Sequence, residues 1–154
     1  MSNNEQPKSA SVHTKAKNST VTPPSDAGDF DRAKRGFIAS LPTGRITNSA
    51  GRMVVDVNRY DFIRAGGPAP ETVNPSLWRH AQLNAHHGLF EVADGVWQVR
   101  GYDISNITFI RGTNGWVVID PLTSEHTARA ALELMDQHVA KLPTTVVIFT
   151  HSHA

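Results

Sequence analysis

The hydrophobic pattern divides the chain at about residue 29. Residues 1–29 are rich in Ser, Thr, Asn, Lys and Pro and contain few large apolar residues. A segment of this composition cannot bury enough apolar surface to offset the entropy that it loses on ordering. We therefore expect residues 1–29 to be a disordered N-terminal extension and residues 30–154 to be the folded part.

The first half of the folded part predicts short elements and one clear helix. The stretch from Asp29 to Pro42 predicts a helical turn followed by an extended piece. Met53–Val55 predicts a short strand, after which Asp56 is expected to cap a helical turn. Asn74 suits the N-cap of a longer helix whose first position is Pro75.

Two dipeptides that favour tight turns, Asp94-Gly95 and Asn114-Gly115, lie in the next segment. "LFEVADGVWQVR" alternates apolar and polar residues on both sides of Asp94-Gly95, and "NITFIRGTNGWVVID" does so around Asn114-Gly115. Such pairs between short alternating runs are strong hairpin signals. This segment predicts an antiparallel meander.

The last segment predicts a β-α-β unit. Apolar residues recur at helical spacing between Ala128 and Leu142, with Thr123 or Ser124 as the cap and Pro143 as the stop. The following run, "TTVVIFT", is typical of a strand that is covered on both faces. Because a helix joins them, the strand "WVVID" and this strand should be parallel. The whole pattern indicates a mixed α/β (α+β) fold.

Composition narrows the function classes. A length of 154 residues suits one modest domain, and a net charge of +1 does not favour nucleic-acid or membrane-surface binding. The absence of cysteine excludes disulfides and thiolate metal sites, so a transition-metal site would need nitrogen and oxygen ligands.

Polar residues follow both strands of the β-α-β unit. Asp120 follows "WVVI", and Thr150, His151 and His153 follow "VVIF". Ligands of open sheets collect beyond the carboxyl ends of parallel strands, and residues two apart on extended backbone point to one side. His151 and His153 are therefore candidate ligands of one metal ion, although an isolated His-x-His pair is a weak motif.

The sequence from about Phe30 to Ala154 resembles the alkyl sulfatases of the metallo-β-lactamase superfamily, most closely in "RGYDISNITFI", "GWVVIDPLTS" and "VVIFTHSHA". The resemblance implies an αββα sandwich with two zinc ions that promote the hydrolysis of alkyl sulfate esters such as dodecyl sulfate. The superfamily signature Thr-His-x-His-x-Asp-His is matched here only from Thr150 to Ala154. His151 and His153 match two zinc ligands.

The incomplete signature implies an N-terminal portion of a truncated metallo-β-lactamase-like domain, with antiparallel hairpins followed by the β-α-β unit. Catalytic zinc normally has three protein ligands, so we expect the 154-residue chain alone to be inactive. Whether the chain is itself an enzyme is thus left open. Two alternatives remain: another hydrolase of the superfamily, such as a thioesterase or lactonase, and a non-catalytic remnant that acts as a binding module.

Four further residues are candidates for weaker roles. Asp120 either caps the turn into the next helix or orients a metal-binding histidine, and the turn role is favoured. In "GYDISN", Tyr102, Asp103 and Asn106 either touch substrate or form a hydrogen-bonded turn, and the turn is favoured.

The remaining expectations concern partners and location. The resemblance implies an alkyl sulfate substrate and a homodimer, whose dimerisation region this sequence does not contain. We expect no nucleic-acid partner and no membrane span, because no run approaches about 20 apolar residues. The N-terminal stretch does not resemble a secretory signal, which favours a cytoplasmic location. A secreted or periplasmic location, as in some relatives, is the alternative.

Overall fold

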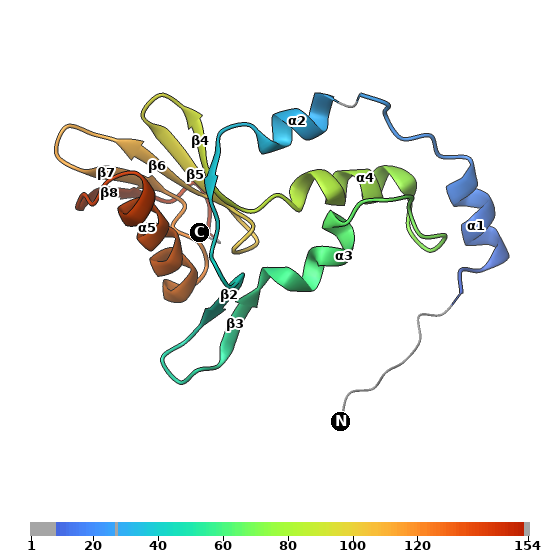
Figure 1. Cartoon of the computed structure of the whole chain (residues 1–154), viewed down its shortest axis with the longest axis horizontal. Coiled ribbons are helices and arrows are strands. Elements are labelled where there is room, and N and C mark those ends of the chain that lie inside the picture. The colour runs from blue at the N-terminus through green and yellow to red at the C-terminus, as the bar shows by residue number, and fades with distance from the viewer. Residues whose placement is uncertain (1–8, 27, 153–154) are drawn as a thin grey trace.

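The computed structural model describes residues 9–26 and 28–152. One six-stranded sheet dominates it, with helix α5 on one face and an arm of shorter helices extending from the side of β1 and β4 (Figure 1). No helix in the described ranges has the length and apolar character needed to cross a membrane.

The sheet confirms the predicted meander and β-α-β unit. Its strand order is β1-β4-β5-β6-β7-β8, antiparallel throughout except for the parallel pair β7 and β8, which α5 connects. The bounds are β1 (Phe37–Ala39), β4 (Gly88–Ala93), β5 (Val96–Arg100), β6 (Ile107–Arg111), β7 (Trp116–Ile119), α5 (Glu125–His138) and β8 (Thr144–Ile148).

The residues that were predicted as N-caps form hydrogen bonds at the starts of their helices. Asn74 Oδ1 accepts hydrogen bonds from the first turn of α4, and Ser124 Oγ accepts one from Thr127 N at the start of α5. Asp56 caps a 3₁₀ turn through Asn58 N. The bounds of the helices of the arm are α2 (Gly28–Lys34), η1 (Val57–Tyr60), α3 (Asp61–Arg64) and α4 (Pro75–Asn84). A separate two-stranded sheet consists of β2 (Arg45–Thr47) and β3 (Met53–Asp56).

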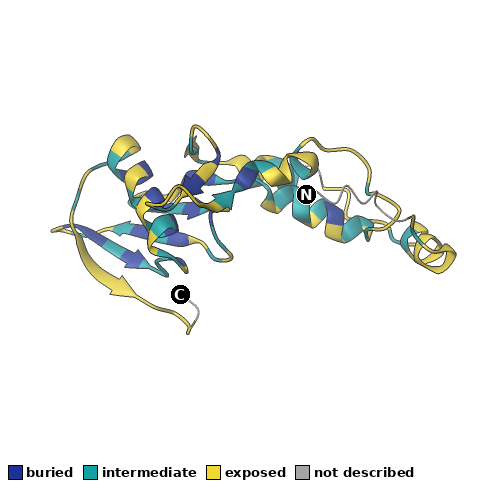
Figure 2. Ribbon diagram, turned by 90° about the horizontal axis from the view of Figure 1, so that it is seen from below, coloured by how far each residue is buried: buried dark blue, intermediate teal, exposed yellow. Residues whose placement is uncertain are grey.

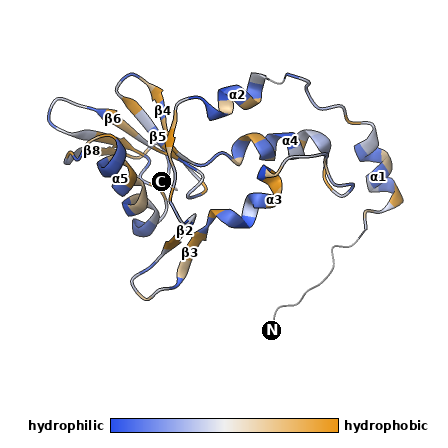
Figure 3. Ribbon diagram, viewed as in Figure 1, coloured by the Kyte–Doolittle hydropathy of each residue, from blue (hydrophilic) through white to orange (hydrophobic). Residues whose placement is uncertain are grey.

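The N-terminal extension differs from the expectation of disorder in one respect. Val12–Ser19 form helix α1, which Ser11 caps by accepting a hydrogen bond from Thr14 N. No residue of α1 is buried, and Figure 3 shows the helix as largely hydrophilic. A local cap therefore stabilises a helix that contributes nothing to the core. The division of the chain at residue 29 stays a prediction, and residues 1–8 lie outside the described ranges.

The core lies between the middle strands and α5. Alternate residues of β5, β6 and β7 are buried, and they form one cluster with the inner face of α5. Trp116, Ala131 and Met135 have no exposed surface at all. Figure 2 shows this as dark blue in the middle of the sheet.

Strand β8 corrects the expectation of a strand covered on both faces. All five of its residues are exposed, and Val146, Val147 and Ile148 each keep 44–45% of their surface accessible. The apolar run does form a strand, but it is the outer strand of the sheet and pairs only with β7 (Figure 2).

Candidate metal site at the carboxyl edge of the sheet

Several strand ends meet at one edge of the sheet. Arg100 pairs with Gly88, Ile107 pairs with Val99, and Ile119 pairs with Ile148 in the register of the sheet. The loop 101–106 and the residues after β7 and β8 therefore lie along the same edge. This is where the sequence placed the candidate site.

Asp120 joins the ends of the two parallel strands. Its backbone N–H donates to Ile148 O at 2.9 Å. Its carboxylate accepts hydrogen bonds from Thr150 N at 2.8 Å and from Thr150 Oγ1 at 2.5 Å. Asp120 thereby fixes the first residues after β8, a contact that differs from the expected cap of the turn into the next helix.

The same carboxylate lies next to His151. Thr150 Oγ1 is 3.0 Å from His151 Nδ1, and Asp120 Oδ2 is 3.9 Å from that nitrogen. The hydrogen bonds from the Thr150 side chain and backbone, joined by the nearby His151 ring, hold the pKa of Asp120 below its ordinary value. Asp120 is therefore ionised at neutral pH and available to orient this histidine. Thr150, the intermediate residue, was not predicted to have such a role.

The turn after β7 has an unusual backbone. Asp120 has φ of 51° and Leu122 has φ of 71°, which few residues other than glycine adopt. Asp tolerates this region better than most residues because its short side chain forms local hydrogen bonds. The strained turn directs the Asp120 carboxylate toward the residues that follow β8.

His151 meets one requirement of a metal ligand. Its side chain is 45% exposed at the sheet edge, and one ring nitrogen is held by a neighbour, as is usual for metal-binding imidazoles. His153 lies outside the described residues. Within residues 9–26 and 28–152, no three or more His, Cys, Asp or Glu side chains gather to hold an ion. The described donors thus fit part of a metal site.

Asp103 is the centre of a hydrogen-bond network in the loop 101–106. Its carboxylate accepts from Ile104 N, from Thr123 N and Oγ1, and from Thr127 Oγ1, all at 2.7–3.0 Å. Burial raises the pKa of Asp103, but the hydrogen bonds together hold it below its ordinary value. Asp103 thus ties the loop to the first turn of α5.

Tyr102 lies in the core. It is 1% exposed, and its hydroxyl oxygen accepts a hydrogen bond from Leu41 N at 2.9 Å. Ser40 Oγ lies 3.3 Å from the same oxygen. Burial raises the pKa of the Tyr102 hydroxyl. Tyr102 therefore anchors the segment after β1.

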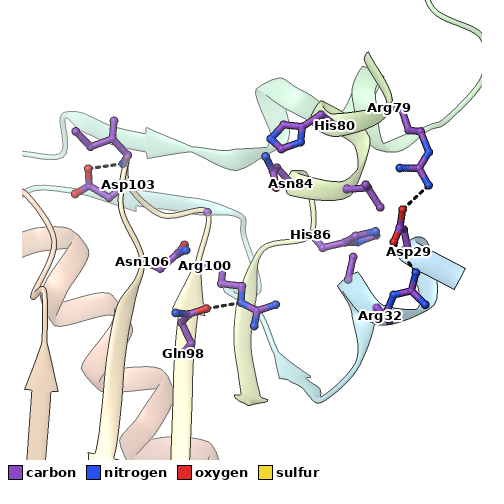
Figure 4. Close-up of a pocket in the computed structure, with 14 residues that line it drawn as sticks. Asp29, Arg32, Arg79, His80, Asn84, His86, Gln98, Arg100, Asp103 and Asn106 are labelled. Carbon is purple, nitrogen blue, oxygen red and sulfur yellow. Dashed lines mark hydrogen bonds and ion pairs between the residues drawn. The ribbon is translucent and has the colours of Figure 1, made fainter. Parts of the chain in front are cut away.

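Asn106 lines a polar cleft between the sheet edge and the helical arm. The cleft has a volume of about 870 Å³, and its walls include Arg32, Arg79, His80, His86 and Arg100. Figure 4 shows that these side chains come from α2, α4, the segment after α4, and β5. Asn106 and Asp103 both line this cleft. The Asn106 side chain forms no hydrogen bond to another described residue, whereas the Asp103 carboxylate is held in the network with Thr123 and Thr127.

The network around Asp103 gives a prediction about stability and pH. Asp103→Asn should lower the free energy of unfolding at pH 7 by about 2 kcal/mol, because hydrogen bonds to a charged group are the stronger kind. The folded-state pKa of Asp103 lies below its unfolded value, so this contribution is present above about pH 4. It is lost as the pH falls through the lower, folded pKa.

Urea unfolding of wild type and variant from pH 2 to pH 7 measures the difference directly. The two stability curves should converge at the acid end. A difference that is independent of pH would contradict the assigned ionised state of Asp103.

Comparisons with known proteins agree on the class. Residues 100–154 match the family model that is described as "Metallo-beta-lactamase superfamily". A linear primary-alkylsulfatase from Pseudomonas sp. is 48% identical over 152 residues, which are 97% of this chain and 23% of that protein. An (R)-specific secondary-alkylsulfatase from Pseudomonas sp. is 48% identical over 149 residues, 95% of this chain and 22% of that protein.

A solved structure shows the same fold. The stereoselective inverting sec-alkylsulfatase Pisa1 from Pseudomonas sp. superposes with a TM-score of 0.85 at 48% identity, over 95% of this chain and 23% of that chain. These findings confirm the resemblance to the metallo-β-lactamase superfamily, whose name implies metal binding. Nearly the whole chain aligns with one part of each of these alkylsulfatases. It spans about 23% of the length of the first of these relatives.

Proposed function

We propose that this chain is the part of a zinc-dependent alkylsulfatase that supplies the first two histidines of the metal centre, His151 and His153. The complete protein then hydrolyses sulfate esters of alkyl alcohols to the alcohol and sulfate. The observation that carries the proposal is the contact of Asp120 with Thr150 and His151 at the carboxyl edge of the sheet. The 48% identity to an alkylsulfatase over nearly the whole chain supports the same substrate class.

The chain's own residues have distinct tasks in this proposal. His151 and His153 would hold zinc, which when bound activates water for attack and polarises the sulfate oxygens. Asp120 sets the position of the backbone at Thr150, and through the Thr150 hydroxyl it orients the His151 ring. Asp103 keeps the neighbouring loop fixed against α5. We propose Asn106 as a residue that faces the substrate's polar end, because it lines the polar cleft.

Two histidines alone should bind zinc weakly. Catalytic zinc sites normally have three protein ligands, and His151 and His153 provide two. Calorimetric titration of the 154-residue chain with zinc is expected to show affinity weaker than about 1 μM. Tight binding at one site would contradict the incomplete ligand set. A His151→Ala variant is the control that separates weak site binding from binding elsewhere.

Two further features stay predictions. The family resemblance supports a homodimer of the complete protein, and the predicted location is cytoplasmic, with a secreted or periplasmic one as the alternative. Neither feature is needed for the assignment of the metal site.

A chimera tests the proposed function. This chain replaces the matching segment of the Pseudomonas linear primary-alkylsulfatase, to which it is 48% identical, and the product is assayed with dodecyl sulfate, a thioester and a lactone. We expect dodecyl sulfate hydrolysis in the presence of zinc and little turnover of the other two. A folded chimera that prefers the thioester or the lactone would favour the alternative hydrolase class.

A non-catalytic binding role is the second candidate. The exposed apolar residues of β8 favour it, because an exposed, apolar edge strand readily pairs with another chain. A chimera that folds and binds zinc but hydrolyses none of the three esters would support this candidate over the first.

A further inference from the structure

An apolar pocket lies beside the polar cleft, at the far side of the sheet from β8. Its volume is about 510 Å³, within the usual range for small-molecule sites. We call it the α2–β1 pocket and define it by Lys34, Phe37, Arg64, Ala85, His86 and Phe90. Neither the family match nor the candidate metal site accounts for it.

Two aromatic rings form the floor of the α2–β1 pocket. Phe37 and Phe90 are partners in the register of β1 and β4, and their ring centroids are 5.4 Å apart in an edge-to-face arrangement. Gly88 makes this approach possible, because a Cβ there would lie 2.4 Å from Ala39 O and 3.1 Å from the Phe37 ring. Phe37 keeps 53% of its surface exposed although it lines a pocket. An exposed ring in this setting is suited to contact an apolar ligand.

Positive charge surrounds the apolar floor. Among the described residues Lys34 forms no ion pair, and Arg64 pairs only with Asp61 on its own helix. No carboxylate lines the pocket. Burial, and after it the charges of Lys34 and Arg64, lower the pKa of His86. The pocket therefore combines an apolar interior with a cationic rim.

The α2–β1 pocket adjoins the polar cleft at two residues. His86 lines both cavities. Arg100, which lines the polar cleft, places its guanidinium 4.5 Å from the centroid of the Phe90 ring in the pocket floor. Figure 4 shows His86 and Arg100 in the wall of the cleft. A ligand with an apolar tail and an anionic head would find both kinds of surface side by side.

We propose that the α2–β1 pocket binds single-chain amphiphilic anions, with the alkyl chain against the exposed ring of Phe37, which packs on the buried Phe90, and the anionic head at Lys34 and Arg64. The candidate metal site lies at β8, and the pocket lies at β1 and β4. With about 4.8 Å between neighbouring strands, roughly 20 Å separate the two. The pocket is thus a capture site apart from the reacting centre. The use of an alkyl sulfate as the probe rests on the proposed function, but binding is measured without turnover.

The test is titration of the isotope-labelled 154-residue chain with octyl, decyl and dodecyl sulfate, followed by NMR, below the micelle concentration of each. Saturable shifts should centre on the backbone amides around Ser40 and Ala85–His87. Each added methylene should tighten binding about threefold to fourfold. Decanoate should bind in the same place if the head is recognised by charge alone. Decyltrimethylammonium and inorganic sulfate should bind at least about tenfold more weakly.

Matched variants test which residues of the pocket bind the ligand. Lys34→Glu should weaken decyl sulfate binding at least about fivefold, whereas the exposed Lys141→Glu should leave it unchanged. Phe37→Ala should weaken binding about fivefold or more and flatten the dependence on chain length. Val92→Ala, at a residue that is 51% exposed on the same sheet, is the apolar control. A thermal melt of each variant separates loss of the ligand from loss of the fold.

Three outcomes would overturn the proposal. Shifts that centre on β8 and Phe149 would place the ligand on the exposed outer strand instead. Equal binding of sulfate ions would reduce the pocket to a general anion site. The absence of any shift at the pocket would show that it does not bind amphiphilic anions. None of these outcomes affects the chimera assay, so the two proposals fail separately.

Discussion

Replacing Trp116 with alanine is expected to lower the free energy of unfolding by about 3–5 kcal/mol, the usual cost of truncating a fully buried large aromatic residue. Trp116 has no exposed surface. Its ring meets Trp97 and Phe109 edge-on, with centroid distances of 5.5 Å and 6.2 Å. Arg111 covers the same ring at 5.5 Å. Single domains have total stabilities of about 5–15 kcal/mol, so this loss would unfold a large fraction of the chain.

Trp116→Phe is the matched control for this prediction. Among the described residues the buried Nε1 of Trp116 has no hydrogen-bond partner. Phenylalanine removes that unsatisfied group while it keeps an aromatic ring, so the expected cost is only about 1–2 kcal/mol. Urea unfolding followed by far-UV circular dichroism measures both variants. Equal costs for alanine and phenylalanine would show that ring packing at this position is not what stabilises the sheet against α5.

Replacing Asp120 with alanine in the alkylsulfatase chimera is expected to lower zinc affinity about 10-fold to 100-fold, with a corresponding loss of dodecyl sulfate hydrolysis. Asp120 contacts Thr150 through two hydrogen bonds and lies 3.9 Å from His151 Nδ1. Without the carboxylate, the segment after β8 loses its connection to the turn after β7. The ligating ring would then have to be ordered at the moment of binding, which costs affinity.

Two further variants and one control test the role of Asp120 in zinc binding. Thr150→Val keeps the backbone N–H to Asp120 and removes the hydroxyl that links Asp120 to His151, so an intermediate loss is expected. Asp120→Asn keeps one accepting oxygen and should also be intermediate. Glu133→Ala, at an exposed position of α5, is the control with unchanged activity. Unchanged zinc content in Asp120→Ala would exclude the positioning role.

Local signals in the sequence predicted the elements that depend on local physics. Asn74 and Ser124 are caps because their side chains bond to backbone N–H groups two or three residues later. The hairpin between β4 and β5 follows from Asp94-Gly95, where Gly95 has φ of 72°. These features involve neighbours in the chain, so the residue types suffice to find them.

Features that depend on distant contacts were not predictable in the same way. Apolar residues in β8 indicate a covered strand, but burial is decided by what lies over the strand, and the described residues leave Val146, Val147 and Ile148 44–45% exposed. β2 (Arg45–Thr47) was missed because it is three residues long and is defined by its pairing with β3. Helix α5 ends at His138, before the Pro143 that marked its latest possible end.

The candidate site also combines features that the sequence predicts with features that depend on distant contacts. The position of Asp120 and His151 beyond two parallel strands follows from the β-α-β pattern. The contacts of Asp103 with Thr123 and Thr127 span 20 and 24 residues, and no signal in "GYDISN" reveals them. The α2–β1 pocket likewise combines residues from Lys34 to Phe90, which only the tertiary structure brings together.

We propose above all that His151 and His153 lie together at the carboxyl edge of the sheet and bind one metal ion there. Anomalous diffraction at the zinc edge, from crystals of the chimera, tests it most directly. We expect a zinc peak within about 2.0–2.1 Å of a ring nitrogen of each histidine, with Asp120 behind His151. A zinc peak elsewhere, with the two imidazole rings directed apart, would contradict the claim.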